Sequence, residues 1–360
     1  MQSPAAVIEN MLSDPEQNGL GVLRLALAML VLISHAFAVG GFGDDPLEIF
    51  SGGTISLGSM AVQGFFAISG YLVSQSWDRL RGARAYLLRR ALRLFPGYWL
   101  CLVISAAFIV PTIWYMQHGS LSAFGSAEPS AWGYVWRNFA LMRWQGTIGD
   151  VASDQIFHGV FNLSLWTLPH EFVWYVALLF IACLGGLRKR GIWPGVVLIA
   201  LLLNYALDPS HDRFLGRLQM TAPVVRLPIY FATGVVWWCW ADHLKVAAPA
   251  WLAVVAIVVV ATAFGQYHWV MPFCMAAILF PLASAFRTPR FLVTRDYSYG
   301  VYLYGIPVER VLAALKLSLA SPWVFCLLAT ALVLPFAILS WHLCEGPALK
   351  LRSRRIKSPS

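Results

Sequence analysis

Long apolar runs recur along almost the whole chain and are separated by short polar stretches. A helix needs about 20 predominantly apolar residues to cross a hydrocarbon core ~30 Å thick. The sixth and seventh runs are short for a full crossing, and their ends are the least sharply marked. We predict membrane-spanning helices at about Leu20–Val39, Ile55–Trp77, Leu94–Val110, Leu165–Leu184, Ile192–Leu207, Leu227–Trp240, Pro249–Phe264, Val270–Phe286, Tyr297–Leu315 and Trp323–Leu343.

Composition supports this interpretation. Of 360 residues, 59% are hydrophobic and 12% are charged, against about 25% charged in soluble domains. We therefore predict an all-α membrane protein, a polytopic bundle of about ten transmembrane helices. A cytoplasmic or interfacial segment (1–19) precedes the membrane domain (20–347), and a basic tail (348–360) follows it. The first 17 residues contain acidic but no basic side chains, which is wrong for a signal peptide.

Basic residues gather in alternate loops between the predicted spans. Runs of them follow the second, fourth and eighth spans and end the chain, while the opposite loops hold far fewer. Because loops rich in Lys and Arg stay in the cytoplasm, this asymmetry predicts that both termini are cytoplasmic. The net charge of +9 therefore comes mainly from the basic loops that orient the chain in the membrane. No basic stripe lies on a soluble domain, so we expect no nucleic-acid partner.

Arg24 and His35 lie inside the first predicted span. An arginine at membrane depth costs roughly 2.5–3.5 kcal/mol on insertion scales, so it is rarely kept without a use. Eleven positions on a helix are three turns plus about 20°, which puts both side chains on nearly the same face, about 16 Å apart along the axis. This pattern indicates a polar path through the bilayer, or two structural residues bonded to neighbouring helices.

Glu171 lies near the start of the fourth predicted span, in the string LWTLPHEFVWYV. His35 is about fifteen residues into an outward-running span, roughly 22 Å from the inner edge. Glu171 is about six residues into an inward-running span, about 21 Å from the same edge. We therefore predict that the carboxylate and the imidazole pair as a general-base dyad. His170 points about 100° away from Glu171 and ranks below it.

Arg89, Arg90 and Arg93 follow the second span in the string YLLRRALRLFPGYW. Arg89 and Arg93 are four positions apart and share one helix face. Guanidinium groups grip phosphates bidentately, so the cluster suits a phosphorylated cytoplasmic ligand. Arginines that only set the membrane orientation of the chain and extend toward lipid headgroups would give the same pattern.

Further strings mark the second, ninth and tenth spans. Ser69 and Gly70 form a small pair in GFFAISGYL, which lets helix backbones approach closely or lines a narrow acyl tunnel. The ninth span opens with DYSYGVYLYGIPV, which holds Tyr299 and Tyr302, and Glu345 follows the tenth in CEGP. Beside the basic tail, Glu345 is expected to cap a helix or to pair with an arginine. The six cysteines lack metal-binding spacing, so we expect packing roles and no metal site.

The longest stretch between spans, about Pro111–Asn162, lies on the outer side and is rich in Trp, Gly and Ser. Its tryptophans form an aromatic belt at the interface or a surface that stacks on sugar rings. A second outer stretch, about Asp208–Arg226, would cover the same opening. The tryptophans are Trp114, Trp132, Trp136 and Trp144.

Taken in order, these strings resemble acyltransferase family 3, the integral membrane O-acyltransferases that include bacterial enzymes acetylating exopolysaccharide, O-antigen and Nod factor. The resemblance runs from about Leu20 to Pro347. It departs from the family at Gly305, where members often have histidine, and no SGNH hydrolase-like domain follows, so we expect transfer to finish within the membrane domain. The matching strings are the R-x10-H of Arg24 and His35, FFAISGYL, the arginines before FPGYW, LWTLPHE with Trp166, SYGVYLYGIP and EGP.

The resemblance implies a multi-pass O-acyltransferase of the bacterial inner (plasma) membrane. The donor would be cytoplasmic acyl-CoA, most often acetyl-CoA with succinyl as the rival group, and no bound cofactor is expected. The acceptor would be a hydroxyl of a cell-surface or periplasmic glycan or of a lipid-linked saccharide, and membrane lipid is the remaining partner. Direct attack on the thioester and a transient acyl-enzyme both remain open.

The resemblance also implies roles for individual residues. His35 is the expected catalytic base, with Glu171 as the acid that orients it. Support for a tunnel or for the fold is expected from Ser69, Gly70, Trp166, Tyr299, Tyr302 and Glu345. Contacts with acyl-CoA are expected at Arg24, Arg89, Arg90 and Arg93.

A secondary transporter or flippase for a glycan or a small anionic substrate is the alternative. Such proteins also place Arg, His and Glu inside the membrane as substrate and proton groups. They are commonly built from two repeated halves with interrupted helices, and the sequence shows no such repeat. Acyl transfer is therefore the favoured function.

Overall fold

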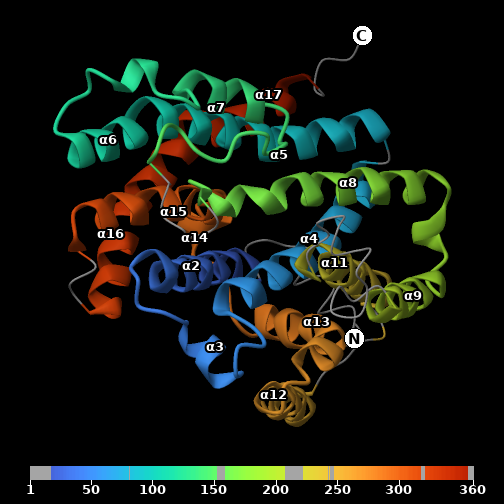
Figure 1. Ribbon diagram of the computed structural model, residues 1–360. Coiled ribbons are helices and arrows are strands. Elements are labelled where there is room, and N and C mark those ends of the chain that lie inside the picture. Colours follow the sequence, from blue (N-terminus) through green and yellow to red (C-terminus); the bar gives the residue numbers. More distant parts are fainter. Residues whose placement is uncertain are drawn as a thin grey trace. The chain divides into compact units, whose positions relative to one another are not determined.

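The computed structural model describes most of the chain, and all regular secondary structure in the described residues is helical (Figure 1). Residues 1–17 of the predicted N-terminal segment lie outside the described residues. The same holds for residues 207–221 of the second outer stretch and for residues 356–360 of the basic tail. The described ranges are 18–80, 82–151, 159–206, 222–241, 243, 247–317 and 321–355.

Six helical segments of the described residues are long and apolar enough to cross a membrane. They coincide with the first four, the eighth and the tenth predicted spans, so the expectation of an all-helical membrane protein is confirmed. The segments are α2 (Leu20–Val39), α4 (Leu57–Leu80), the run of α5, η1 and α6 (Ala83–His118), η4 with α8 (Leu163–Cys183), α13 (Tyr267–Ala285) and the run of α16, η7 and α17 (Pro322–Lys350).

The other four predicted spans also coincide with helices. Helix α12 is apolar but only 16 residues long, which is short for a core ~30 Å thick. The count of ten spans and the cytoplasmic position of both termini stay predictions. The four helices are α9 (Ile192–Ala206), α11 (Ala222–Trp240), α12 (Ala248–Ala263) and α15 (Ser298–Ala314).

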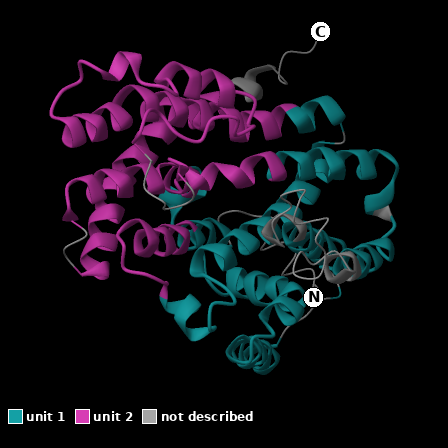
Figure 2. Cartoon of the chain, in the orientation of Figure 1, with its two compact units in different colours: residues 1–27, 46–87, 171–294 teal, residues 28–45, 88–170, 295–360 magenta. Residues whose placement is uncertain are grey.

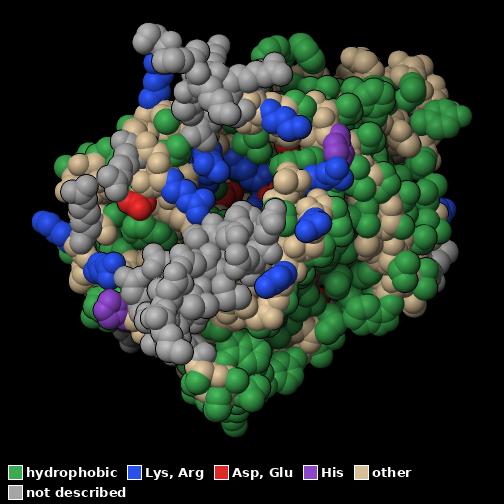
Figure 3. Space-filling view, turned by 180° about the vertical axis from the view of Figure 1, so that it is seen from behind, with side chains coloured by type: hydrophobic (Ala, Val, Ile, Leu, Met, Phe, Trp, Pro, Cys, Tyr) green, Lys and Arg blue, Asp and Glu red, His purple; other side chains and the backbone are tan. Residues whose placement is uncertain are grey.

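Large apolar side chains are exposed on the candidate spans. Phe180 on α8 and Leu327 on α16 expose 67% and 71% of their surface. A lipid-facing helix needs such side chains, whereas soluble proteins seldom keep large apolar patches. On the face drawn in Figure 3, hydrophobic side chains cover a broad area, and Lys and Arg side chains gather in another part of it. This distribution is typical of a protein that lies in a bilayer.

The chain divides into two compact units (Figure 2). Unit 1 comprises residues 1–27, 46–87 and 171–294. Unit 2 comprises the remaining residues, 28–45, 88–170 and 295–360. Helices α2, α5 (Ala83–Ile104) and α8 (Thr167–Cys183) contribute residues to both. The single membrane domain expected at 20–347 stays a prediction.

Unit 1 depends on the crossing of α4 and α11. A Cβ atom on Gly70 of α4 would lie 2.0 Å from the carbonyl oxygen of Phe231 on α11. Reciprocally, a Cβ atom on Gly234 would lie 1.9 Å from the carbonyl oxygen of Ala67. The two glycines therefore let the backbones touch, which supports the packing interpretation of Gly70. Unit 1 also holds α9, α12, α13, α3 (Pro46–Phe50), η5 (Gly186–Arg188) and α14 (Arg290–Val293).

Helix α15 runs through the core of unit 2, and nearly all of its residues are buried. A Cβ atom on Gly300 would lie 2.6 Å from the Cα atom of Ala337 on α16 (Pro322–Ser340). Tyr304 stacks on Phe336 with 5.5 Å between ring centroids. Early residues of α15 thus meet late residues of α16, and the two helices are antiparallel. Unit 2 also holds η1 (Ser105–Ile109), α6 (Val110–His118), η2 (Phe124–Ser126), α7 (Ala131–Asn138), η4 (Leu163–Trp166), η7 (Trp341–Glu345) and α17 (Gly346–Arg355).

A proline inside α15 explains one buried polar contact of unit 2. Pro307 has no N–H, so the carbonyl of Leu303, four residues earlier, loses its helical hydrogen bond. The Asn162 side chain donates to that oxygen at 2.9 Å, and the Cys101 thiol donates to it at 3.5 Å. Asn162 is only 1% exposed. The segment before η4 is therefore tied to α15 at the carbonyl that Pro307 leaves without a helical partner.

The α4–α11 contact can be tested with Gly70→Ala. We expect a loss of about 1–3 kcal/mol in unfolding free energy, because an added methyl group forces the two backbones apart. Gly195→Ala on α9 is the matched control, since its Cβ atom would meet nothing within 4 Å and alanine is the better helix former. Thermal unfolding of the purified protein in detergent measures both variants. Equal melting temperatures for Gly70→Ala and the parent would contradict the close packing.

Candidate active site

His35 lies on α2, which has the bounds that the hydrophobic pattern predicts. Glycines at 41 and 43 adopt φ values of 73° and 86°, a region that favours glycine, in the turn that leads from α2 to Asp45. The Asp45 carboxylate interacts electrostatically with His35 and accepts a hydrogen bond of 2.6 Å from the Ser34 hydroxyl. Asp45 is 1% exposed. Within unit 2, His35 therefore has a buried acid close by.

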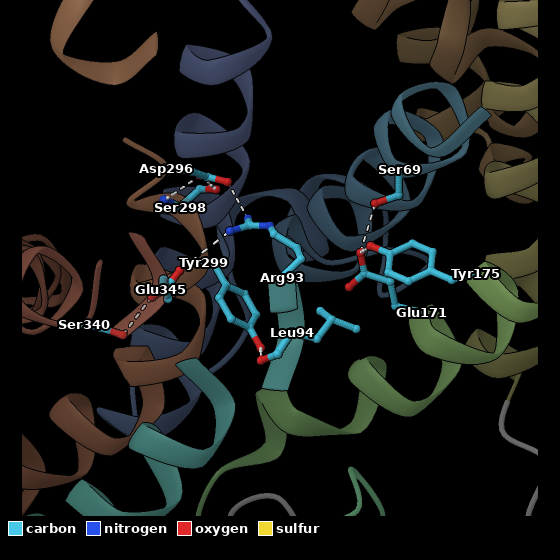
Figure 4. Close-up of polar contacts among 10 residues, drawn as sticks. All are labelled: Ser69, Arg93, Leu94, Glu171, Tyr175, Asp296, Ser298, Tyr299, Ser340 and Glu345. Atoms are coloured by element: carbon cyan, nitrogen blue, oxygen red, sulfur yellow. Dashed lines mark hydrogen bonds and ion pairs between the residues drawn. The ribbon is translucent and has the colours of Figure 1, made fainter. Parts of the chain in front are cut away.

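Glu171 lies in the first two turns of α8 and is held by two hydroxyl groups (Figure 4). Ser69 of α4 donates to its Oε1 atom at 3.1 Å. Tyr175, one turn further along α8, donates a short hydrogen bond to the same oxygen. The backbone carbonyl of Tyr175 in turn accepts a 2.9 Å hydrogen bond from Tyr86 of α5. Neighbouring groups of unit 1 therefore fix the carboxylate of Glu171 in one orientation.

The predicted pairing of His35 with Glu171 stays a prediction. His35 belongs to unit 2 and Glu171 to unit 1, and the contacts above describe each of them inside its own unit. Each has a polar surrounding of its own, Asp45 and Ser34 around the imidazole, Ser69 and Tyr175 around the carboxylate.

Arg93 of α5 is bound to two carboxylates of unit 2 (Figure 4). Its Nη2 atom donates a short, charge-assisted hydrogen bond to Asp296, and its Nη1 atom lies 3.6 Å from Glu345 Oε2. The guanidinium carbon also sits 5.0 Å from the centre of the Tyr299 ring, within the range of a cation–π contact. Glu345 thus pairs with an arginine, one of the two roles expected of it.

Each of the two carboxylates that bind Arg93 accepts a hydrogen bond from a different serine. Ser298, the first residue of α15, donates its hydroxyl and its backbone N–H to Asp296. Ser340, at the end of α16, donates to Glu345 at 2.8 Å. Glu345 is 1% exposed, so the ion pair is largely shielded from water. The cluster joins α5, α15 and η7 within unit 2.

Two of the predicted support residues hold helix ends together by their hydroxyl groups. Tyr299 donates to the carbonyl of Leu94 at 2.7 Å. Tyr302 lies 2.6 Å from the Thr167 hydroxyl and donates to the carbonyl of Ser164 at 2.8 Å. Both tyrosines are buried. The string SYGVYLY therefore ties α15 to α5 and to the η4–α8 junction.

The remaining predicted residues are placed as follows. Trp166 ends η4 and makes an edge-to-face contact with His170, at 5.8 Å between ring centroids. Arg24 lies on α2 in unit 1, whereas Arg89 and Arg90 lie on α5 in unit 2. All three arginines are partly buried. Their contact with acyl-CoA stays a prediction.

Sequence reasoning missed two polar partners in these clusters, Asp45 and Tyr175, and a further buried acid of unit 2, Glu309. Asp45 lies eleven residues beyond Ser34, in a glycine-rich turn, and its contact with α2 depends on how that turn folds back. Tyr175 was detectable, because it is four residues from Glu171 and therefore on the same helix face. Glu309 stands in an apolar stretch of α15, which is the signal that should have marked it.

The four tryptophans of the stretch predicted to lie on the outer side do not form one surface. Trp114 is buried and stacks on His118 at 4.2 Å between ring centroids. Trp132, Trp136 and Trp144 are exposed. These three are available for an interfacial belt or for stacking on sugar rings, and both interpretations stay predictions.

Comparison with known proteins decides the class of this site. The sequence matches the family described as "Acyltransferase domain" over residues 17–342, a range that holds His35, Glu171 and the arginines of α5. The chain belongs to this acyltransferase family. The six apolar segments make it a membrane acyltransferase.

Two relatives of this acyltransferase are similar over nearly their whole length. The chain is 28% identical to the "O-acetyl transferase" of Shigella phage Sf6 over 359 residues, covering 95% of this chain and 98% of that protein. It is 26% identical to "Nodulation protein 10" of Rhizobium leguminosarum bv. viciae over 368 residues, covering 95% of both. No solved structure matches the chain.

The Arg93 cluster of the acyltransferase predicts the effect of Arg93→Ala. The substitution leaves Asp296 and Glu345 facing each other without their cation, so we expect a loss of about 1.5–3 kcal/mol in unfolding free energy. Arg84→Ala is the control, because Arg84 is on the same helix but exposed. Adding Glu345→Gln to Arg93→Ala should restore part of the lost unfolding free energy, because it removes one of the two facing carboxylates. If Arg93→Ala unfolds at the temperature of the control in detergent, the cluster does not stabilise unit 2.

Proposed function

We propose that this membrane acyltransferase moves an acetyl group from cytoplasmic acetyl-CoA to a hydroxyl of a cell-surface or periplasmic glycan in the bacterial inner membrane. The observation that carries the proposal is the family match over residues 17–342, which includes every residue assigned to the chemistry. The name of the phage relative supports O-acetyl transfer. A nodulation protein among the relatives agrees with the glycan acceptor that the sequence resemblance implies.

The chemistry requires a base and a held donor. The oxygen of the acceptor hydroxyl attacks the thioester carbon, a new C–O bond forms, and the C–S bond breaks. The hydroxyl proton passes to the base and then to the departing thiolate, which leaves as coenzyme A. His35 is the base in this proposal, because an imidazole can accept and return a proton near neutral pH.

An acid beside His35 would fix its tautomer and stabilise the imidazolium. Glu171 is the acid we assign on the strength of the sequence motif and the matching depth. Asp45 is a second acid for the same role, supported by its electrostatic interaction with His35 and its burial. Substitution separates the two assignments. Only the acid that pairs with His35 should, when replaced by its amide in Asp45→Asn or Glu171→Gln, lower O-acetylation as far as removal of the base does.

The donor is polyanionic and cannot cross hydrocarbon, so its phosphates must be held at the cytoplasmic surface. Arg24, Arg89, Arg90 and Arg93 are the residues we assign to acyl-CoA. Arg93 is also paired with Asp296 and Glu345, so in this proposal it positions α5 as well. A narrow passage beside Ser69 and Gly70 would admit the acyl-pantetheine arm alone.

The test replaces His35. His35→Ala should lower O-acetylation by about 10²–10⁴-fold, the usual cost of removing a general base. Cells lacking the gene are complemented with each variant, and the acetyl content of their surface glycans is measured by mass spectrometry. His118→Ala is the matched control, because His118 is partly exposed and its imidazole is paired with Asp150 rather than with a residue of the proposed site.

Two results would contradict this assignment. A His35→Ala protein that is present in the membrane at the parental level and acetylates normally would remove His35 from the mechanism. A parental protein that leaves the glycans of the complemented cells unacetylated would remove glycan O-acetylation itself.

A further inference from the structure

Glu309 is a buried acid of α15 that none of the contacts described so far uses. It is 0% exposed, and neither of its carboxylate oxygens has a hydrogen-bond partner among the residues that the structure describes. The neighbouring Arg310 interacts with it electrostatically, but Arg310 donates to the carbonyls of Phe161 at 2.9 Å and Val160 at 2.8 Å. Burying a carboxyl group without hydrogen bonds is costly. Such a group calls for a partner other than the described residues, and a bound ligand can supply it.

The position of Glu309 on α15 shows which neighbours it faces. Tyr302, Gly305 and Glu309 are spaced i, i+3 and i+7 and therefore share one helix face. Tyr302 contacts Ser164 and Thr167 at the η4–α8 junction. The face that Glu309 continues is therefore the one turned toward that junction.

The same face of α15 lies against α2. A Cβ atom on Gly305 would sit 3.8 Å from the Leu32 side chain, with no closer neighbour outside the helix's own backbone. The outer end of α2 packs on the start of α16, because the rings of Phe37 and Trp323 are 5.7 Å apart. Since α15 and α16 are antiparallel, the end of α15 also lies at the start of α16. Helices α2 and α15 therefore run in the same direction here.

Parallel helices let the level of His35 be compared with that of Glu309. His35 is three residues beyond Leu32, a rise of about 4.5 Å, and Glu309 is four residues beyond Gly305, a rise of about 6 Å. His35 lies on the same face of α2 as Leu32, and Glu309 lies on the same face of α15 as Gly305. The base and the unpartnered acid therefore lie at nearly the same depth of unit 2, on facing sides of two adjacent helices.

We propose that Glu309 binds the acceptor, by accepting a hydrogen bond from a sugar hydroxyl adjacent to the one that His35 deprotonates. This inference rests on the function proposed above. A carboxyl group has an acceptor oxygen in either protonation state, and ring hydroxyls are donors. The thioester group itself has no hydrogen-bond donor, and the amide N–H groups of the acyl-CoA arm lie further along the arm. Glu309 also lies in the second half of α15, away from the Arg93 end that we assign to the donor.

The test uses purified full-length protein in detergent, acetyl-CoA, and simple methyl glycosides as acceptors. The glycoside with the highest parental rate is compared with its deoxy analogue, which lacks the hydroxyl next to the acetylated one. The KM for the glycoside should rise at least tenfold in Glu309→Leu while the KM for acetyl-CoA stays unchanged. The parent should disfavour the deoxy analogue, and Glu309→Leu should treat both glycosides alike. Glu309→Gln keeps an acceptor oxygen and should keep most of the discrimination.

Stability gives an independent readout. Leucine in place of an unpartnered buried acid should leave the melting temperature equal or higher. Glu128→Leu, on an exposed loop of the same unit, is the matched control and should leave both KM values unchanged. A lower melting temperature for Glu309→Leu would show a structural role and overturn the inference.

The kinetic outcomes separate this inference from the proposed function. An active parent whose Glu309→Leu variant keeps its KM for the glycoside overturns the inference alone. A rise in the KM for acetyl-CoA instead of the glycoside also overturns it, because Glu309 would then serve the donor. A parent that acetylates none of the glycosides and none of the host glycans overturns the proposed function and this inference together.

Discussion

The structure depends on one constraint: a polar group that a helical bundle buries among apolar side chains has to find its partner inside the protein. Unit 2 shows three solutions. Pro307 removes a helical hydrogen bond from Leu303, and Asn162 replaces it. The positive charge of Arg93 meets Asp296 and Glu345, which are themselves held by serines. The guanidinium of Arg310 donates hydrogen bonds to the carbonyls of Val160 and Phe161. These contacts join α5, α15, η7 and the segment before α8, and so they fix the frame of unit 2, the unit that also holds His35.

The same constraint separates residues that build the fold from residues that are available for chemistry. The guanidinium of Arg93 is paired with Asp296 and Glu345, so Arg93 positions α5 within unit 2. Ser69 and Tyr175 both donate to the same oxygen of Glu171. His35 has the buried acid Asp45 close by. Glu309 has no hydrogen bond within the described residues, and a sugar hydroxyl would complete it. Polar groups at membrane depth are costly, so each of these side chains needs a partner in the protein or in a ligand.

Much of this was predictable from the sequence, because membrane helices leave strong signals. The first span was predicted with its observed bounds, and each of the ten apolar runs coincides with a helix of the structure. The family followed from strings such as R-x10-H and SYGVYLYGIP, and the match over residues 17–342 confirms it. The partners of the polar residues were not predictable in the same way. The pairing of Arg93 with Asp296 joins positions 203 residues apart, and the approach of Asp45 to α2 depends on a glycine-rich turn. Such contacts are set by how helices pack, and a hydrophobic pattern does not contain that information.

In the proposed reaction, an acetyl group enters from the cytoplasmic side and leaves on a hydroxyl at the opposite face. The direct test reconstitutes the purified protein into sealed vesicles that contain a methyl glycoside and receive radiolabelled acetyl-CoA from outside only. Acetyl-CoA does not cross the bilayer, so the account predicts labelled, acetylated glycoside inside the vesicles, at a rate that falls at least 10²-fold with His35→Ala. Label that appears only on glycoside added outside, or transfer to the inside that is independent of the protein, would contradict it.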